Sequence, residues 1–227
     1  MKIVILGNSV VSRIRPRIEN EKTYSEILQN NSVKVTIYAY GAAKIDYFKK
    51  DFMQIIDETA DIYIINYGVV EACNRSISES LYNYVQKKSN NIFEKISLKL
   101  INYFENRFRR QLVKLRGYKS WLSENEFKKY YCELITVIKK HTKAKIVCIG
   151  INKPSTRIEN QLPGSSENIN RFNYIINEIC LNESSIFIDV YSLIKQNCIP
   201  DGVHYNSHGH IELASEIEKK IKYVRKD

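Results

Sequence analysis

The chain has 227 residues and a formal net charge of +10, and 44% of its residues are hydrophobic. This length suits one α/β domain with a full core and is short for two. Five cysteines without C-x-x-C spacing argue against a disulfide framework and favour reduced thiols in a cytoplasmic protein. The four apolar residues before Gly7 are too few for a signal-peptide core, and no apolar run approaches the roughly 18 residues of a membrane span.

Short apolar runs rich in β-branched residues recur along the chain. Because they are continuous and not alternating, they predict strands that are buried on both faces, as in a parallel sheet. Segments of helical period separate them, so we expect a three-layer α/β/α sandwich around about five parallel strands. The predicted strands are residues 2–6, 33–39, 61–67, 145–150 and 185–190.

Two segments show clear helical spacing near the C-terminus. One contains Ile169, Phe172 and Ile176, and Ser165 or Ser166 is its expected N-cap. The other repeats the pattern over residues 211–221.

The stretch from about 76 to 141 is longer than an ordinary crossover. It predicts a helical insertion of two or three helices, on the side of the functional site, within a single domain spanning residues 1–227.

The insertion carries most of the positive charge. Ten basic residues stand against two glutamates between Lys87 and Lys119. This charge has three readings: a solvated helical face, a site for an anionic partner such as an acyl-coenzyme A, a lipid-linked sugar phosphate or an anionic membrane surface, or a nucleic-acid site. No nucleic-acid motif accompanies the charge, which makes the third reading the weakest. The ten residues are Lys87, Lys88, Lys95, Lys99, Arg107, Arg109, Arg110, Lys114, Arg116 and Lys119.

Glycine-containing segments follow the predicted strands. Gly7-Asn8-Ser9, Tyr40-Gly41-Ala42, Gly68-Val69-Val70-Glu71 and Gly150 each come directly after an apolar run. Because the carboxyl ends of parallel strands meet at one edge of the sheet, we expect these segments to converge there.

The chemistry rests on Ser9, Asp201 and His204. A carboxylate can orient an imidazole, and the imidazole can take the proton of a serine hydroxyl at neutral pH. Ser9 is then the nucleophile, His204 the general base and acid, and Asp201 its partner. The backbone N–H groups of Ser9 and Gly41 are candidate oxyanion donors. This acyl-transfer chemistry requires no cofactor.

Other interpretations of these residues exist. Ser9 could simply cap a helix after the first strand. Asp201, His204, His208 and His210 could bind a metal ion, although no second ligand cluster accompanies them and His208 and His210 suit surface or cap positions. The single tryptophan, Trp121, is expected to pack in the core or in a lid.

These residues resemble the SGNH family, also called the GDSL-type hydrolases and acyltransferases. The likeness lies in four blocks and extends from residue 4 to about residue 215. The blocks are Leu6-Gly7-Asn8-Ser9-Val10, the loop around Gly41, Gly68-Val69-Val70-Glu71, and Asp201-Gly202-Val203-His204 followed by Gly209-His210. The resemblance implies a flavodoxin-like fold and a serine-dependent esterase or O-acyltransferase.

Two positions depart from the family pattern. The family usually has Asp where Asn8 stands, at a position without a chemical role. Its third block usually supplies an Asn side chain to the oxyanion hole where this chain has Val70, and valine cannot donate a hydrogen bond. One such donor contributes roughly 2.7–4 kcal/mol to the transition state. Asn66, Asn74 or Arg75 would have to replace it, and Asn74 is the expected donor.

The segment from Tyr67 to Arg75 also resembles a variant of this block found in family members associated with bacterial surface-glycan synthesis. This resemblance implies a carbohydrate ester as substrate, an acetyl group as the acyl group, and substrate-binding roles for Glu71 and Arg75. The loss of the oxyanion Asn supports an alternative, which is a catalytically impaired glycan-binding or scaffold protein with the same fold.

Overall fold

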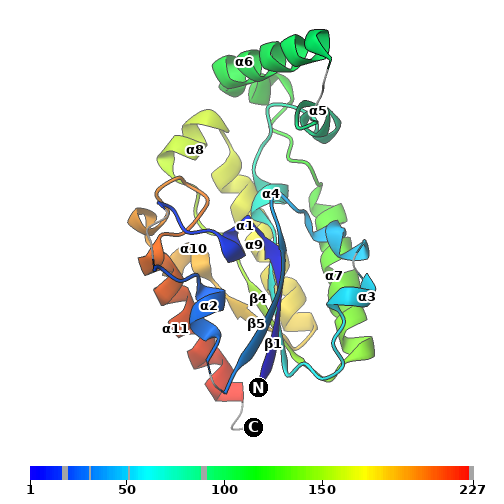
Figure 1. Ribbon diagram of the computed structural model, residues 1–227, viewed down its shortest axis with the longest axis vertical. Helices are drawn as coiled ribbons and strands as arrows, with labels where there is room; N and C mark the ends of the chain where they lie inside the picture. The colour runs from blue at the N-terminus through cyan, green and yellow to red at the C-terminus, as the bar shows by residue number, and fades with distance from the viewer. Residues whose placement is uncertain (17–19, 31, 51, 88–90, 225–227) are drawn as a thin grey trace.

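The computed structural model describes residues 1–16, 20–30, 32–50, 52–87 and 91–224. Its centre is a five-stranded, fully parallel sheet in the order β2-β1-β3-β4-β5. This order and the helices around the sheet confirm the predicted α/β architecture (Figure 1). The strands are β1 Lys2–Asn8, β2 Lys34–Tyr40, β3 Ile62–Asn66, β4 Lys145–Ile149 and β5 Ile186–Ile188.

The inner strands β1 and β3 explain why the apolar runs are continuous. All five residues of β3 are buried, as are the six residues of β1 that follow Lys2. Gly7 pairs with Asn66 where the strands end. A Cβ atom on Gly7 would lie 2.7 Å from the Asn66 carbonyl oxygen and 2.5 Å from Val11 Cγ2. Only glycine therefore allows the chain to turn so tightly out of the sheet.

Helices cover both faces of the sheet. The helices α7 and α9 pack together, and α2 packs with α11 (Figure 1). The helical segments are α1 Ser9–Ser12, α2 Tyr24–Leu28, η1 Ile45–Lys49, α3 Phe52–Ile55, α4 Val69–Ala72, α5 Glu79–Val85, α6 Ile92–Leu115, α7 Glu124–His141, α8 Thr156–Gln161, α9 Ser165–Asn182, α10 Val190–Leu193, η2 Gln196–Cys198 and α11 Ser207–Val224.

The expected cap of α9 is wrong. Gly164 occupies the N-cap position with a left-handed φ of 80°, and neither Ser165 nor Ser166 does so. The Ser165 hydroxyl instead donates to the Leu162 carbonyl and accepts the N–H of Asn74. Tertiary contacts therefore decide this helix end.

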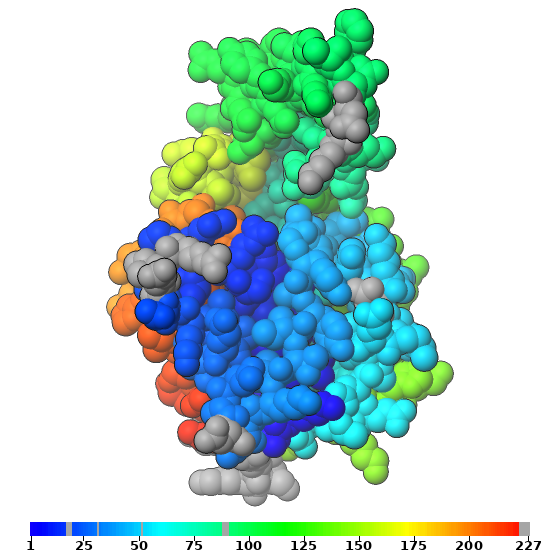
Figure 2. Space-filling model, viewed as in Figure 1, coloured from blue at the N-terminus to red at the C-terminus, as the bar shows by residue number. Residues whose placement is uncertain are grey.

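The stretch 76–141 contains α5, α6 and α7. Helix α7 contributes five buried apolar side chains to the core and packs on α9, as a crossover helix does. Helices α5 and α6 lie beyond the carboxyl ends of the strands, at the top of the molecule in Figures 1 and 2. Lys88, one of the ten basic residues counted above, falls outside the described residues.

The five cysteines are free thiols, and all but Cys132 are buried. Within the described ranges, no helix combines the length and the apolar character that crossing a bilayer requires.

Candidate active site

Ser9 stands at the first position of α1, directly after β1. The residue before it, Asn8, is the N-cap, and its Oδ1 accepts the N–H of Val10 at 3.1 Å. Because Asn8 satisfies this orphan donor, the Ser9 hydroxyl does not cap the helix. The hydroxyl is left to contact the C-terminal part of the chain.

The structure brings Ser9, His204 and Asp201 together. Oγ of Ser9 lies 2.9 Å from Nε2 of His204, although the two residues are 195 positions apart in the sequence. Nδ1 of His204 lies 2.8 Å from Oδ2 of Asp201. Both distances are those of hydrogen bonds, so a proton can pass from the hydroxyl to a ring whose orientation the carboxylate fixes.

The loop around Asp201 holds the carboxylate in place. Its Oδ1 accepts the backbone N–H groups of Val203 at 2.9 Å and His204 at 2.7 Å. Burial disfavours the charge of Asp201, but the His204 ring and these two N–H groups outweigh burial and lower the pKa of Asp201 to about 2. Gly202 has φ 85°, a left-handed conformation that suits glycine in this turn. The carboxylate is therefore ionised at neutral pH.

Ser9 lies in the wall of a cavity of about 570 Å³. Its other walls combine apolar side chains, two aromatic rings and three arginines, and none of the described residues that line it is a carboxylate. The lining residues are Ser9, Arg13, Gly41, Ala42, Val69, Val70, Cys73, Arg75, Tyr82, Gln86, Arg109, Trp121, Ile158, Leu162 and Val203. Gly41 and Val70 thus line the same cavity as Ser9.

Asn74 and Asn66 do not supply the donor that Val70 lacks. Nδ2 of Asn74 donates to the Pro163 carbonyl at 2.6 Å, and its Oδ1 accepts from Asn168. Nδ2 of Asn66 donates to the Tyr24 hydroxyl at 3.1 Å. Neither asparagine lines the cavity. The expectation that Asn74 completes the oxyanion hole is therefore not supported, because its amide already joins α4, α8 and α9.

Glu71 is fully buried and also absent from the cavity wall. Its Oε1 accepts the N–H of Ile45 at 2.6 Å, and its Oε2 accepts the N–H of Gly68 at 3.1 Å. It thereby links the segments that follow β2 and β3. Burial raises the pKa of Glu71 to about 7, against these backbone hydrogen bonds. This geometry gives Glu71 a positioning role for the loop of Gly41 and not the substrate contact that the resemblance implies.

Arg75 lies in the cavity wall. Its guanidinium stacks on Trp121, with Cζ 4.1 Å from the ring centroid, and Nη2 donates to the Val70 carbonyl at 2.6 Å. Its Nε is buried and has no hydrogen-bond partner among the described residues. A buried donor without a partner is costly. Arg75 is thus a side-chain donor of this wall with unused capacity.

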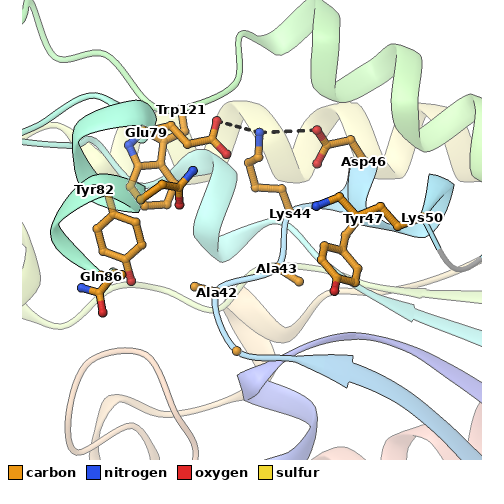
Figure 3. Close-up of a pocket in the computed structure, with 12 residues that line it drawn as sticks. Ala42, Ala43, Lys44, Asp46, Tyr47, Lys50, Glu79, Tyr82, Gln86 and Trp121 are labelled. Carbon is orange, nitrogen blue, oxygen red and sulfur yellow. Dashed lines mark hydrogen bonds and ion pairs between the residues drawn. The ribbon is translucent and has the colours of Figure 1, made fainter. Parts of the chain in front are cut away.

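A second cavity of about 450 Å³ adjoins the first, and both include Gly41, Ala42, Tyr82, Gln86 and Trp121. In Figure 3 the Lys44 ammonium lies between two carboxylates, 2.8 Å from Glu79 and 3.4 Å from Asp46. Tyr82 and Trp121 line one side and Tyr47 the other (Figure 3). The space offers aromatic faces beside polar groups.

The sequence predicts surface or cap positions for His208 and His210, and of these two only His208 has one. His210 is buried in α11, where Nδ1 accepts the N–H of Tyr24 and Nε2 lies 3.1 Å from the Arg13 carbonyl. It ties α11 to α2 and to the segment after Ser9. His208 is exposed. No group of three or more metal-ligating side chains occurs in the part of the chain that the structure describes.

Sequence reasoning did not find several residues of the cavity. Arg13, Tyr82, Gln86 and Arg109 line it, and Trp121, expected only to pack, belongs to both cavities. The basic and aromatic residues of the insertion are a signal for all of these except Arg13 and Gln86, but nothing in the sequence shows which of them face Ser9.

No protein-family model and no curated protein matches this sequence. Solved structures match almost its whole length. An acetylxylan esterase from Geobacillus stearothermophilus is 13% identical, with a TM-score of 0.59, and the match covers 97% of this chain and 93% of that chain. A lipase/acylhydrolase from Enterococcus faecalis is 13% identical, with a TM-score of 0.63 and coverages of 97% and 95%. A carbohydrate acetylesterase from Sinorhizobium meliloti is 11% identical, with a TM-score of 0.63 and coverages of 98% and 99%.

At these identities the comparison shows a shared fold. Variants of the Geobacillus esterase described as catalytic mutants replace a serine, an aspartate and a histidine by alanine. In that esterase the aspartate lies three residues before the histidine.

Proposed function

We propose that this protein is a serine-dependent esterase or O-acyltransferase that acts on acyl groups, expected to be acetyl, of a carbohydrate. The observation that carries the proposal is the continuous hydrogen-bonded chain Ser9–His204–Asp201, whose serine lies in the wall of a cavity. The catalytic mutants of the acetylxylan esterase support it, since that enzyme has the same three residue types and the same spacing of aspartate and histidine.

The reaction has two halves. In the first, Oγ of Ser9 attacks the ester carbonyl while Nε2 of His204 takes the hydroxyl proton. The tetrahedral intermediate collapses, the sugar alcohol leaves with the proton from His204, and the acyl group stays on Ser9. In the second half, His204 takes a proton from water or from a second sugar hydroxyl, which attacks the acyl-serine. The bond between the acyl carbon and Oγ of Ser9 then breaks, His204 returns the proton to Oγ, and an acid or a new ester is released.

The developing oxyanion needs hydrogen-bond donors. We assign this role to the backbone N–H groups of Ser9 and Gly41, which follow neighbouring strands. Arg75 takes the place of the missing asparagine, because it lies in the same wall as Val70 and its Nε is unused among the described residues. Glu71 keeps the Gly41 loop beside β3 through its bond to Ile45.

The two adjoining cavities suit a sugar ester. A sugar ring offers C–H faces to aromatic rings and hydroxyl groups to polar side chains, and both kinds of partner line the cavities. Trp121 and Tyr82 supply the aromatic faces, and Gln86 supplies an amide. Two of the compared structures are esterases of acetylated carbohydrates, which supports the same substrate class.

Val70 keeps one alternative open, a glycan-binding or scaffold protein with the same fold and little turnover. The valine lies in the cavity wall at the position where the family supplies its donor. This alternative predicts that the protein binds acetylated sugars without cleaving them.

An activity assay separates the two functions. We expect the purified protein to hydrolyse a chromogenic acetate ester, and Ser9→Ala to lower kcat by at least about a thousandfold. Ser12→Ala, at the exposed end of the same helix, is the matched control and retains activity. Added sugars that accelerate acetyl release and become acetylated identify a transferase. Equal turnover by wild type and Ser9→Ala contradicts the proposal, and glycan binding without turnover favours the alternative.

A further inference from the structure

Helix α6 exposes an unusual apolar face. Its exposed apolar side chains are Ile92, Phe93, Ile96, Leu100, Tyr103, Phe104, Phe108 and Leu115. The helix is kinked at Phe108, whose φ of -116° and ψ of 19° are not helical. At 100° per residue, the six apolar side chains that precede this kink fall within about a third of the helix circumference. Phe93 is 78% exposed and Tyr103 63% exposed. Exposed patches of this kind mark interaction sites.

The opposite face of α6 is fixed to the rest of the protein. Leu98 and Val113 are buried there. The Glu105 carboxylate accepts from Ser76 and binds Arg109 through two hydrogen bonds of 2.7 and 2.6 Å. Arg109 also lines the cavity of Ser9. The apolar face is therefore directed away from the rest of the protein. The position of α6 at the top of Figures 1 and 2 agrees with this direction.

Basic residues accompany the apolar face. Lys95, Lys99, Arg107, Arg110 and Lys114 are exposed, and no ion pair engages them among the described residues. By helical position Lys95, Lys99 and Arg107, which precede the kink at Phe108, lie within the apolar face or up to about 60° from its edge. The two acidic residues of α6 are Glu94 and Glu105. Both lie by helical position on the other side, and Glu105 is bonded to Arg109. The face thus combines apolar side chains with uncompensated positive charge.

We propose that α6 lies on an anionic lipid membrane surface, with its apolar face inserted at the boundary of headgroups and acyl chains. An amphipathic helix with aromatic and aliphatic residues on one side and Lys or Arg beside them is the pattern of interfacial helices. Lipid headgroups neutralise the cations while the acyl region buries the apolar side chains. Both parts of the face thus acquire a partner at once.

Other binding partners would match either the cations or the apolar side chains of this face, but not both. The phosphate backbone of a nucleic-acid duplex neutralises the cations but leaves the rings of Tyr103, Phe104 and Phe108 exposed to water. The centroids of these rings are 5.8 and 6.0 Å apart along the helix. A second copy of α6 buries the rings but brings like charges together, without acidic residues on that face to offset them. The charge therefore favours the lipid surface.

Vesicle binding by the full chain tests the proposal. We expect the protein to sediment with vesicles of phosphatidylcholine mixed with phosphatidylglycerol, and to bind pure phosphatidylcholine far more weakly. Replacing Lys95, Lys99 and Arg110 together by Gln should weaken binding to the mixed vesicles about a hundredfold, because each contact contributes on the order of fivefold. Neutralising Lys219, Lys220 and Lys222 of α11 changes the net charge equally and should have little effect.

A second variant tests the apolar contribution. Phe93→Ser, Tyr103→Ser and Phe104→Ser combined should abolish the binding that persists at high salt, since screening removes the electrostatic part alone. The matched control replaces exposed Tyr174 and Leu181 of α9 by Ser and should bind like wild type. Unchanged thermal unfolding shows that the variants are folded. No binding to anionic vesicles, a dimer in solution that the triple Ser variant dissociates without any vesicle binding, or binding to DNA alone would each overturn the proposal.

Discussion

Asn8 caps helix α1 through the N–H of Val10, at 3.1 Å, and thereby leaves the hydroxyl of its neighbour Ser9 to His204. This division of roles predicts the effect of Asn8→Ala. The loss of the cap should lower the free energy of unfolding by about 1 kcal/mol. Activity should fall by more than stability accounts for, because the start of α1 positions Ser9. Chemical denaturation and ester turnover measure the two effects.

Ser123→Ala provides the comparison for Asn8→Ala. Ser123 caps α7 by accepting the N–H of Glu126, and it does not line the cavities. We expect a similar loss of stability and normal turnover. If both variants lost stability equally and both kept full activity, Asn8 would have no role in positioning Ser9.

The sequence is enough to predict the parallel sheet, because runs such as Ile3–Leu6 are apolar on both faces of the strand. It also predicts that Ser9 and Gly41 meet, since the carboxyl ends of parallel strands share an edge. It does not predict where Asn74 and Glu71 point. Whether a polar side chain faces a cavity or an internal loop depends on tertiary contacts, here the Pro163 carbonyl for Asn74 and the N–H of Ile45 for Glu71.

The charge of Asp201 is expected to matter for turnover more than for binding. Asp201→Asn keeps the shape of the side chain but removes the charge that stabilises the protonated His204 ring. We predict a fall in kcat of about a thousandfold or more, with little change in KM. Asp189→Asn, which retains a good N-cap residue for α10, is the control.

The pH dependence of turnover gives a second measurement of the same role. Because the pKa of Asp201 is lowered to about 2, the carboxylate stays charged until the pH falls through that value. Activity lost between pH 7 and 4 should therefore not arise from protonation of Asp201. An Asn variant with normal kcat would contradict this role.

An asparagine at position 70 should compensate in part for the loss of the Arg75 side chain. Arg75→Gln removes the proposed oxyanion donor and should lower kcat by about a hundredfold to a thousandfold. Val70→Asn introduces an amide at the position that the family resemblance assigns to a donor. We expect it to have a small effect alone and to restore part of the activity of Arg75→Gln. Steady-state kinetics of the two single variants and the double variant form a complete cycle. Strictly additive losses would contradict the proposed exchange of donors.

Glu71 should make folding stability depend on pH. Burial raises its pKa from an ordinary value of 4.5 to about 7, so the folded protein holds this proton more tightly than the unfolded chain. Its contribution to stability is fully present below pH 4.5 and is lost as the pH rises through 7. The shift corresponds to a change on the order of 3 kcal/mol.

Glu71→Gln tests this expectation. The variant should be less stable overall, because an amide cannot accept both N–H groups of Ile45 and Gly68 as a carboxylate does. Its free energy of unfolding should nevertheless depend less on pH between 5 and 8 than that of wild type. Glu58→Gln, at an exposed loop position, is the control and should leave the dependence unchanged. Parallel pH profiles for Glu71→Gln and wild type would show that Glu71 does not titrate in this range.

The most direct measurement is covalent labelling by a serine-directed phosphonate, followed by peptide mass spectrometry. The hydrogen bond of 2.9 Å between Ser9 and His204 should activate this hydroxyl above all other serines. We predict a single adduct on the peptide that contains Ser9, and its loss in His204→Ala although Ser9 is still present. An intact protein that remains unlabelled, or labelling that is equal with and without His204, would contradict the claim that these two residues form a catalytic pair.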